Sequence, residues 1–285
     1  MKEKYLKALL VLPALILFVG IGIYPLIFAL RSSLYMWNYG AVSKFVGLGN
    51  YLELFKSDFF YNSLKNTSIY VVVAVSFEFI IGLVLALFTN HKLGKFRSTI
   101  RTAITIPMLV SPVVVGILWR MIYNPHYGLF NWVMGTQGFA PTGSIIYSIF
   151  FVALADIWQW TPFMYIIFLA ALQSVPKDIT EAASVDGANY WQNLFHITLP
   201  SISYAMIIAF ILRFMDTTKA LDIIYTLTMG GPGISTETIG YFIFRKAFND
   251  FNIGFATAYA VLFAIILGVI ITTFLKWLNR RFNVV

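Results

Sequence analysis

The chain has 285 residues, of which 59% are hydrophobic and only 11% are charged. Soluble domains carry roughly 25% charged residues, so this chain cannot cover a globular surface, and a disordered chain is excluded for the same reason. A nucleic-acid-binding domain is excluded as well, despite the net charge of +8. The absence of cysteine removes disulfides, thiolate nucleophiles and Cys-ligated zinc. A polytopic membrane protein remains.

Apolar runs divide the chain into segments that can cross a bilayer, for which about 20 residues are needed. Such runs form helices, because backbone polar groups in lipid must be satisfied within the segment. We therefore predict an all-α fold, with an N-terminal helix and external loop in residues 1–65 and a core of five helices in residues 66–285. The six predicted spans are residues 8–30, 66–89, 102–119, 145–172, 201–222 and 255–275.

Six spans place both termini on the same side of the membrane. The loops and termini of that side hold 11 Lys and Arg in 57 residues, whereas the opposite loops hold 7 in 92. Cytoplasmic loops are the ones enriched in Lys and Arg. We therefore expect both termini in the cytoplasm.

Residues 174–200, which connect the fourth and fifth predicted spans, have a pattern of their own. Asp178 and Glu181 form an Asp-x-x-Glu capping pattern for a short helix, and Asp186-Gly187 interrupts that helix. Beyond the interruption, apolar and polar side chains alternate with helical periodicity, which predicts an amphipathic helix–turn–helix. On this pattern alone, a helix that lies flat on the lipid surface is an alternative.

The same segment resembles the EAA loop of the ABC importer permeases. The resemblance implies that the loop is the coupling helix that docks into a cytoplasmic ATPase, and it places residues 174–200 in the cytoplasm. It also implies the type I importer permease fold, transport by alternating access, and a location in the inner or plasma membrane of a prokaryotic cell. The matching residues are Glu181, Ala182, Ala183, Asp186, Gly187, Ala188, Ile197, Leu199 and Pro200.

Two further stretches are similar to the sugar-type permeases, the group that includes the maltose and glycerol-phosphate importers. One runs from Asp222 through Gly230-Gly231-Pro232 to Phe248, and the other, from Pro13 to Asn38, resembles the first-subunit (maltose F-like) branch. The resemblance implies a second homologous permease, two ATPase subunits that use ATP and Mg, and an extracytoplasmic solute-binding protein. This chain has no Gly-x-x-x-x-Gly-Lys-Ser/Thr motif, so we expect no cofactor on it and no enzyme activity.

Polar side chains form a stripe on each of two consecutive predicted spans. Charges at membrane depth normally face a cavity or a partner, so the stripes predict a shared polar interior. Trp160 would stack on a sugar ring there, while the carboxylate, amide and guanidinium groups would bond hydroxyls. The stripes are Asp156, Gln159 and Trp160 at i, i+3 and i+4, and Arg213, Asp216, Thr217 and Ala220 at i, i+3, i+4 and i+7.

Alignment with the maltose-type permeases implies solute contacts at all seven of these residues, and at Met108 and Pro112. Charged groups stand here where those permeases have neutral ones. We expect the solute to be an oligosaccharide. Because Arg213 is cationic, an acidic sugar or a phosphorylated polyol is an alternative solute. A structural alternative is that Arg213 forms an ion pair with Asp216 or Asp156 that holds the helices together.

A different class of transporter also has to be considered. Glu78 stands alone in the second predicted span, where it would form an interhelical hydrogen bond or carry a proton. With Asp156 it could serve a self-sufficient, proton-coupled secondary transporter, although the two halves of the chain lack the corresponding interruptions that inverted repeats would show. His91, His126 and His196 are too far apart for metal-ligand spacing, so no metal is expected.

Overall fold

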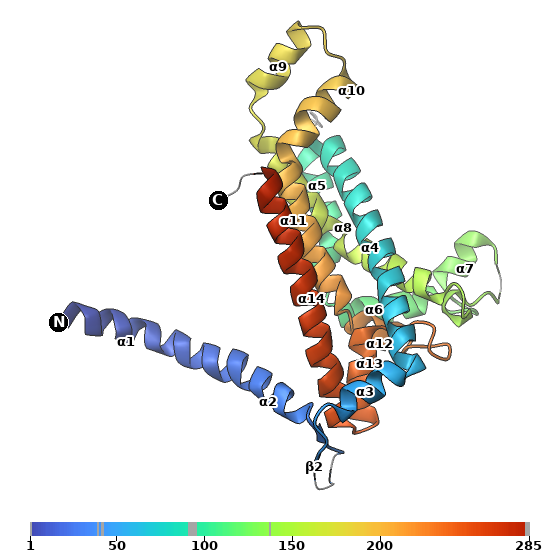
Figure 1. The fold of residues 1–285 in the computed structure, drawn as a ribbon. Coiled ribbons are helices and arrows are strands. Elements are labelled where there is room, and N and C mark those ends of the chain that lie inside the picture. The colour runs from blue at the N-terminus through green and yellow to red at the C-terminus, as the bar shows by residue number, and fades with distance from the viewer. Residues whose placement is uncertain (1, 39, 41–42, 91–95, 137, 283–285) are drawn as a thin grey trace. The chain divides into compact units, whose positions relative to one another are not determined.

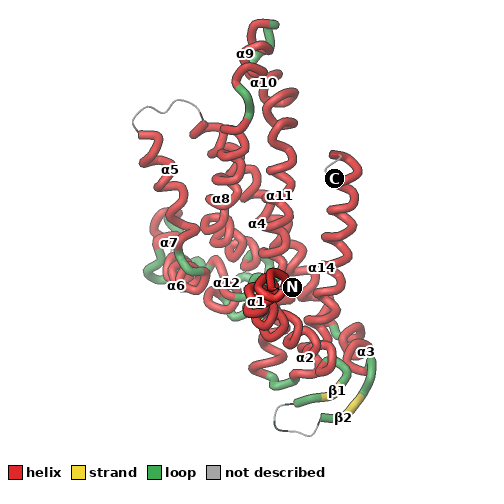
Figure 2. Tube along the Cα trace, turned by 90° about the vertical axis from the view of Figure 1, so that its left-hand side faces the viewer, coloured by secondary structure: helices red, strands yellow, loops and turns green. Residues whose placement is uncertain are grey.

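The computed structural model describes residues 2–38, 40, 43–90, 96–136 and 138–282, and most of these residues are helical (Figure 1). They divide into two compact units, Met1–Phe60 with Phe242–Trp277 (unit 1) and Tyr61–Tyr241 with Leu278–Val285 (unit 2). In the described part of the chain, the only sheet is the antiparallel pair β1 (Tyr35–Met36) and β2 (Lys44–Phe45), seen in Figure 2. The all-α prediction is confirmed.

Within the described residues, five helices are long and apolar enough to cross a membrane, or six if one bent pair counts as a single span. Each of the six predicted spans coincides with one of these helical segments. The five long ones are Leu10–Ser32, Asp58–Asn90, Ser148–Ser174, Tyr190–Thr218 and Ile253–Leu278, and the bent pair is Arg97–Leu109 with Pro112–Ile122.

The third predicted span, residues 102–119, is not a straight helix. Its two halves meet at an angle of 97°, and they comprise α5 (Arg97–Thr105), the 3-10 turn Ile106–Leu109 and α6 (Pro112–Ile122). Ser111 at the break has an extended backbone, with φ −59° and ψ 139°. The cause is Pro112, because a proline ring disfavours the helical conformation of the residue before it.

The fifth predicted span, residues 201–222, begins and ends earlier than expected. α10 (Tyr190–Asn193) continues through the π-helical turn Leu194–Thr198 into α11 (Leu199–Thr218). Lys219 leaves the helical conformation, and α12 (Asp222–Leu227) starts a separate helix. The prediction that Ala220 shares a helical face with Arg213 is therefore wrong, since the helix has ended two residues before it.

Unit 2 contains most of α4 (Asp58–Asn90) and all of α8 (Ser148–Ser174), which pack closely. A Cβ added to Gly82 of α4 would lie 2.7 Å from the Cβ of Met164 in α8, so the helices meet where one has no side chain. α8 also packs against α11, and α12 against α6. The remaining short helices are α7 (Leu129–Met134), the 3-10 turn Pro141–Gly143, α9 (Lys177–Val185) and α13 (Ile239–Phe244).

Unit 1 is built from the two ends of the chain. The N–H of Gly254 donates to the carbonyl of Trp37 at 3.1 Å, which ties the hairpin to the start of α14. The rings of Phe60 and Phe242 meet Tyr259 edge-on, at centroid distances of 5.1 and 5.4 Å. Its helices are α1 (Lys2–Leu17), a π-helical segment Phe18–Ile23, α2 (Tyr24–Ser32), α3 (Gly49–Lys56), a π-helical turn Arg245–Asn249, and α14 (Ile253–Phe282), whose last residues pass into unit 2.

Candidate functional site

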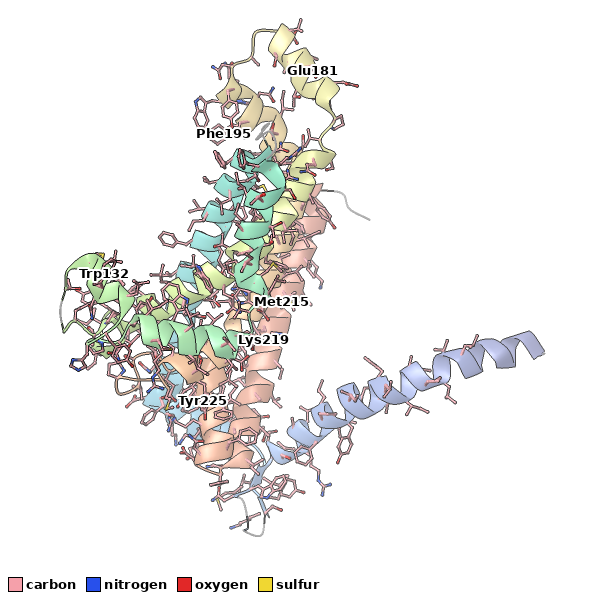
Figure 3. All side chains as sticks on the ribbon, turned by 180° about the vertical axis from the view of Figure 1, so that it is seen from behind. Trp132, Glu181, Phe195, Met215, Lys219 and Tyr225 are labelled. Carbon is pink, nitrogen blue, oxygen red and sulfur yellow. The ribbon has the colours of Figure 1, made fainter. Side chains whose placement is uncertain are left out.

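A cavity of about 360 Å³ opens inside unit 2, lined by α8, α11, α12 and the start of α6. Figure 3 shows Lys219, one of its lining residues, in the middle part of unit 2. Eight of the nine solute-contact residues predicted from the sequence line this one cavity. The lining comprises Pro112, Asp156, Gln159, Trp160, Arg213, Asp216, Thr217, Lys219, Ala220, Leu221, Asp222 and Ile223.

The structure does not bring every predicted residue to the cavity, and it adds several. Met108 lies in the 3-10 turn before the bend and is not part of the lining. Ala220 does line it, from the linker after α11 rather than from the predicted helical face. Lys219 and Asp222 were visible in the sequence as charges at the end of a span, but the cavity could not be assigned to them without knowing where the helix ends.

Arg213 is the centre of a buried cluster of charged side chains. Its Nε and Nη2 donate to the two carboxylate oxygens of Glu78, each at 2.7 Å. Nη2 also donates to Asp156 at 2.8 Å, and Nη1 donates to Asp216 at 3.0 Å. The side chains of Arg213 and Glu78 are 3% and 0% exposed, whereas that of Asp216 is 55% exposed. The ion-pair hypothesis is correct for both partners considered. The interhelical hydrogen bond expected for Glu78 is confirmed as well, although the sequence did not identify Arg213 as its partner.

Trp160 contributes an aromatic face to the same cluster. The guanidinium carbon of Arg213 lies 4.9 Å from the centroid of the Trp160 ring, a distance at which a cation is attracted to the ring's negative face. The indole predicted to stack on a sugar therefore also stacks on the arginine. This contact fixes both side chains at the edge of the cavity.

Two buried polar side chains in the lining retain bonding capacity. Gln159, which is 1% exposed, donates from Nε2 to the carbonyl of Val110 at 2.8 Å, but its Oε1 has no partner within the described residues. The Oγ1 of Thr217, which is 2% exposed, also has no hydrogen-bond partner within the described residues. Buried polar atoms are nearly always hydrogen-bonded, so the lining side chains hold two unsatisfied oxygens, both enclosed by the atoms around them.

The predicted coupling loop lies at one end of unit 2, where Figure 3 shows Glu181 and Phe195. Glu181 is exposed within α9, together with Ala182, while Ala183 is half-buried. Asp178 does not cap α9, contrary to the capping pattern: Pro176 is the N-cap residue, and no side chain accepts a hydrogen bond there. A proline at that position already sets the entry of the chain into the helix.

The interruption at Asp186-Gly187 is a defined helix end. Gly187 has φ +84°, and its N–H donates to the carbonyl of Ser184 at 3.2 Å. The N–H of Ala188 donates to the carbonyl of Ala183 at 2.9 Å. This is the Schellman arrangement, in which the left-handed residue is usually glycine because it has no Cβ. The motif explains why a glycine stands here and how α9 turns sharply into the next helix.

α10 begins with a capping box that the sequence reasoning did not identify. The side chain of Asn189 accepts from the N–H of Gln192 at 2.9 Å, and the Gln192 side chain accepts from the N–H of Asn189 at 2.8 Å. The signal was the Asn-x-x-Gln spacing, which is a variant of the known box. The rings of Trp191 and Phe195 stack on each other with their centroids 6.1 Å apart. These residues are 63% and 58% exposed. Leu199 is half-buried and Pro200 is exposed at the start of α11.

No group of three or more His, Cys, Asp or Glu side chains that could hold a metal ion occurs among the described residues, which do not include His91. The carboxylates that gather in unit 2 surround Arg213 instead.

Comparison with known proteins places the chain among transport proteins. It is 38% identical to the trehalose/maltose transport system permease protein MalF of Thermococcus litoralis, over 89% of this chain and 85% of that protein. It is 30% identical to the sn-glycerol-3-phosphate transport system permease protein UgpA of Pectobacterium atrosepticum, over 99% of this chain and 97% of that one.

The fold has a solved counterpart as well. A chain of a bacterial alginate ABC transporter, solved in complex with an alginate pentasaccharide-bound periplasmic protein, matches with a TM-score of 0.85 at 24% identity, over 98% of this chain and 96% of that one. The family model described as "Binding-protein-dependent transport system inner membrane component" matches residues 78–284. This chain belongs to that family of transport permeases.

Proposed function

We propose that this chain is a solute-translocating permease subunit of an ATP-driven, binding-protein-dependent carbohydrate importer that works by alternating access. The observation that carries the proposal is the polar cavity around Arg213, formed by helices long and apolar enough to span a membrane. Ionisable groups at membrane depth are rare and mark solute pathways or cavities. The names of the relatives, which transport trehalose, maltose or glycerol phosphate, support a carbohydrate or related polyol.

The proposed assembly contains a second homologous permease, two cytoplasmic ATPase subunits that use ATP and Mg, and an extracytoplasmic solute-binding protein. The loop 174–200 would dock on the ATPase, with both termini of the chain in the cytoplasm. Exposed Glu181 and the exposed rings of Trp191 and Phe195 support a docking role, because large apolar side chains left open at the end of a bundle mark a partner surface. Within this assembly, residues 1–65 would be an N-terminal addition to a translocating core, residues 66–285.

The proton-coupled alternative loses its main support in the structure. Glu78 and Asp156, the two carboxylates it would use as proton carriers, both accept hydrogen bonds from Arg213. Both carboxylates are thus tied into one ion cluster with the guanidinium, and a proton carrier would have to break these bonds in each transport cycle.

Uptake in proteoliposomes tests the proposal. We expect ATP-dependent uptake of a radiolabelled carbohydrate only when this chain, its partner permease, the ATPase and the binding protein are all present. Thr217→Val, which removes an unpartnered hydroxyl from the cavity, should reduce uptake, while Thr272→Val on an exposed face of α14 should not. Uptake by this chain alone, driven by a proton gradient, would contradict the proposal.

A further inference from the structure

We propose that the cavity selects neutral, hydroxyl-rich solutes over anionic ones, and that Glu78 sets this selectivity from outside the cavity by occupying Arg213. The inference rests on the proposed function, since it names the class of solute that the same cavity takes. Relatives of this chain include permeases named for neutral disaccharides and one named for a phosphate ester, so family membership does not decide the class. The chemistry of the residues that line the cavity decides the class of solute.

Arg213 has almost no capacity left for an anionic solute. A guanidinium carries five N–H donors. The bonds to Glu78, Asp156 and Asp216 use the Nε donor, both Nη2 donors and one Nη1 donor. One face of the group is turned to the Trp160 ring. A carboxylate or phosphate binds arginine best through two parallel N–H groups. One such pair, Nε and Nη2, is taken by Glu78, and the pair on Nη2 and Nη1 is divided between Asp156 and Asp216.

The rest of the lining favours groups that donate hydrogen bonds. The carboxylate oxygens of Asp216 can only accept, and the Asp216 side chain is 55% exposed. Three carboxylates and two cations line the cavity, and of the cations only exposed Lys219 is outside the Arg213 cluster. Sugar hydroxyls can donate to these oxygens, whereas a uronate or phosphate brings further acceptors and a negative charge.

Glu78 acts in this arrangement through Arg213 and is a positioning residue. It is fully buried and is not part of the cavity lining, so a solute does not reach it. Both of its oxygens hold the Nε and Nη2 edge of the guanidinium. Glutamine leaves one oxygen that accepts and an NH₂ group that cannot, so the guanidinium is held by fewer bonds and can turn a pair of its donors toward the cavity. A variant without the Glu78 carboxylate should therefore accept anionic sugars that the natural protein rejects.

The test measures the ratio of two affinities in the complete membrane complex, purified in detergent and without the binding protein. The probes are radiolabelled neutral mono- to trisaccharides and their uronate counterparts of equal length, in equilibrium dialysis at fixed ionic strength. We expect the unaltered complex to prefer the neutral series, and Glu78→Gln to lower this preference by about tenfold, which corresponds to ~1.4 kcal/mol. A change confined to stability would alter the amount of folded complex and leave the ratio unchanged.

Two exposed positions keep the test decisive if Glu78→Gln does not assemble. Asp216→Asn frees the Nη1 donor at a side chain that is 55% exposed, and it should lower the preference in the same direction. Asp222→Asn is the matched control, since it removes a negative charge from the lining without touching Arg213, and its effect should stay within about twofold because exposed charges are screened.

Preference of the unaltered complex for uronates would overturn the inference, as would an unchanged ratio in every well-assembled variant that frees Arg213. An equal shift in Asp222→Asn would also overturn it, because net charge alone would then explain selectivity. Binding of neither series would instead overturn the proposed carbohydrate site, and the inference with it.

Discussion

Replacing Arg213 with alanine should destabilise the protein strongly, and the partner whose removal restores stability can be named from the geometry. The substitution leaves Glu78 fully buried and Asp156 4% exposed, two carboxylates that have lost their cation. Breaking a buried ion pair by removing one partner costs about 3–5 kcal/mol. Adding Glu78→Gln should recover part of this loss, because it removes the carboxylate that held two of the arginine's bonds, while Asp156 stays buried without its cation.

Adding Asp216→Asn instead should recover little. The Asp216 side chain is 55% exposed, and an exposed ion pair contributes at most about 1 kcal/mol. The assay is the midpoint of denaturant-induced unfolding of the complex in detergent, with size-exclusion chromatography to report assembly. Equal recovery by the two second substitutions, or an unchanged midpoint in Arg213→Ala, would refute the ranking of Glu78 above Asp216.

Four other substitutions test other parts of the molecule. Glu181→Lys, which reverses an exposed charge of α9, and Gly187→Pro, because proline cannot adopt the φ of +84° at 187, should abolish ATPase stimulation by the binding protein while the complex stays inserted. Normal stimulation and uptake in both variants would remove the coupling role. Asn189→Ala should destabilise the start of α10 by about 1 kcal/mol, seen as faster amide exchange there. Gly82→Leu should lower the unfolding midpoint by forcing α4 from α8, whereas Gly268→Leu, with open space around its Cβ position, should not.

The positions of the spans could be read from the sequence because lipid imposes a length and a composition on them. Their ends could not, because a helix can continue beyond the lipid with polar residues. α4 begins at Asp58, eight residues before the predicted start, and α10 enters α11 without a break. The bend before Pro112 had a visible signal in Pro107 and Pro112, but apolar length alone favoured a straight span.

The residues of the cavity could be predicted from the sequence for a different reason. Helical periodicity places Asp156, Gln159 and Trp160 on one face of α8, and the family resemblance indicated that this face and that of α11 share the solute path. What periodicity cannot supply is the register between helices. Glu78 looked isolated because its partner is 135 positions away in the chain. That carboxylate lies on α4 one turn before Gly82, where α4 packs closely against α8.

The two interpretations of Arg213, an ion pair that holds helices together and a residue of the solute path, describe different edges of one guanidinium. The Nε and Nη2 edge is buried against Glu78 and Asp156, on two helices other than its own. The Nη1 edge reaches Asp216, whose carboxylate is open to the cavity. Separating α4 from α11 would leave a buried carboxylate without its cation, so the first edge resists such a movement. The second edge can exchange Asp216 for one sugar hydroxyl at little cost, because that bond is exposed, but it does not offer the two parallel N–H groups that an anion binds best. One arginine can therefore fix three helices of the bundle and still present a polar group to a solute.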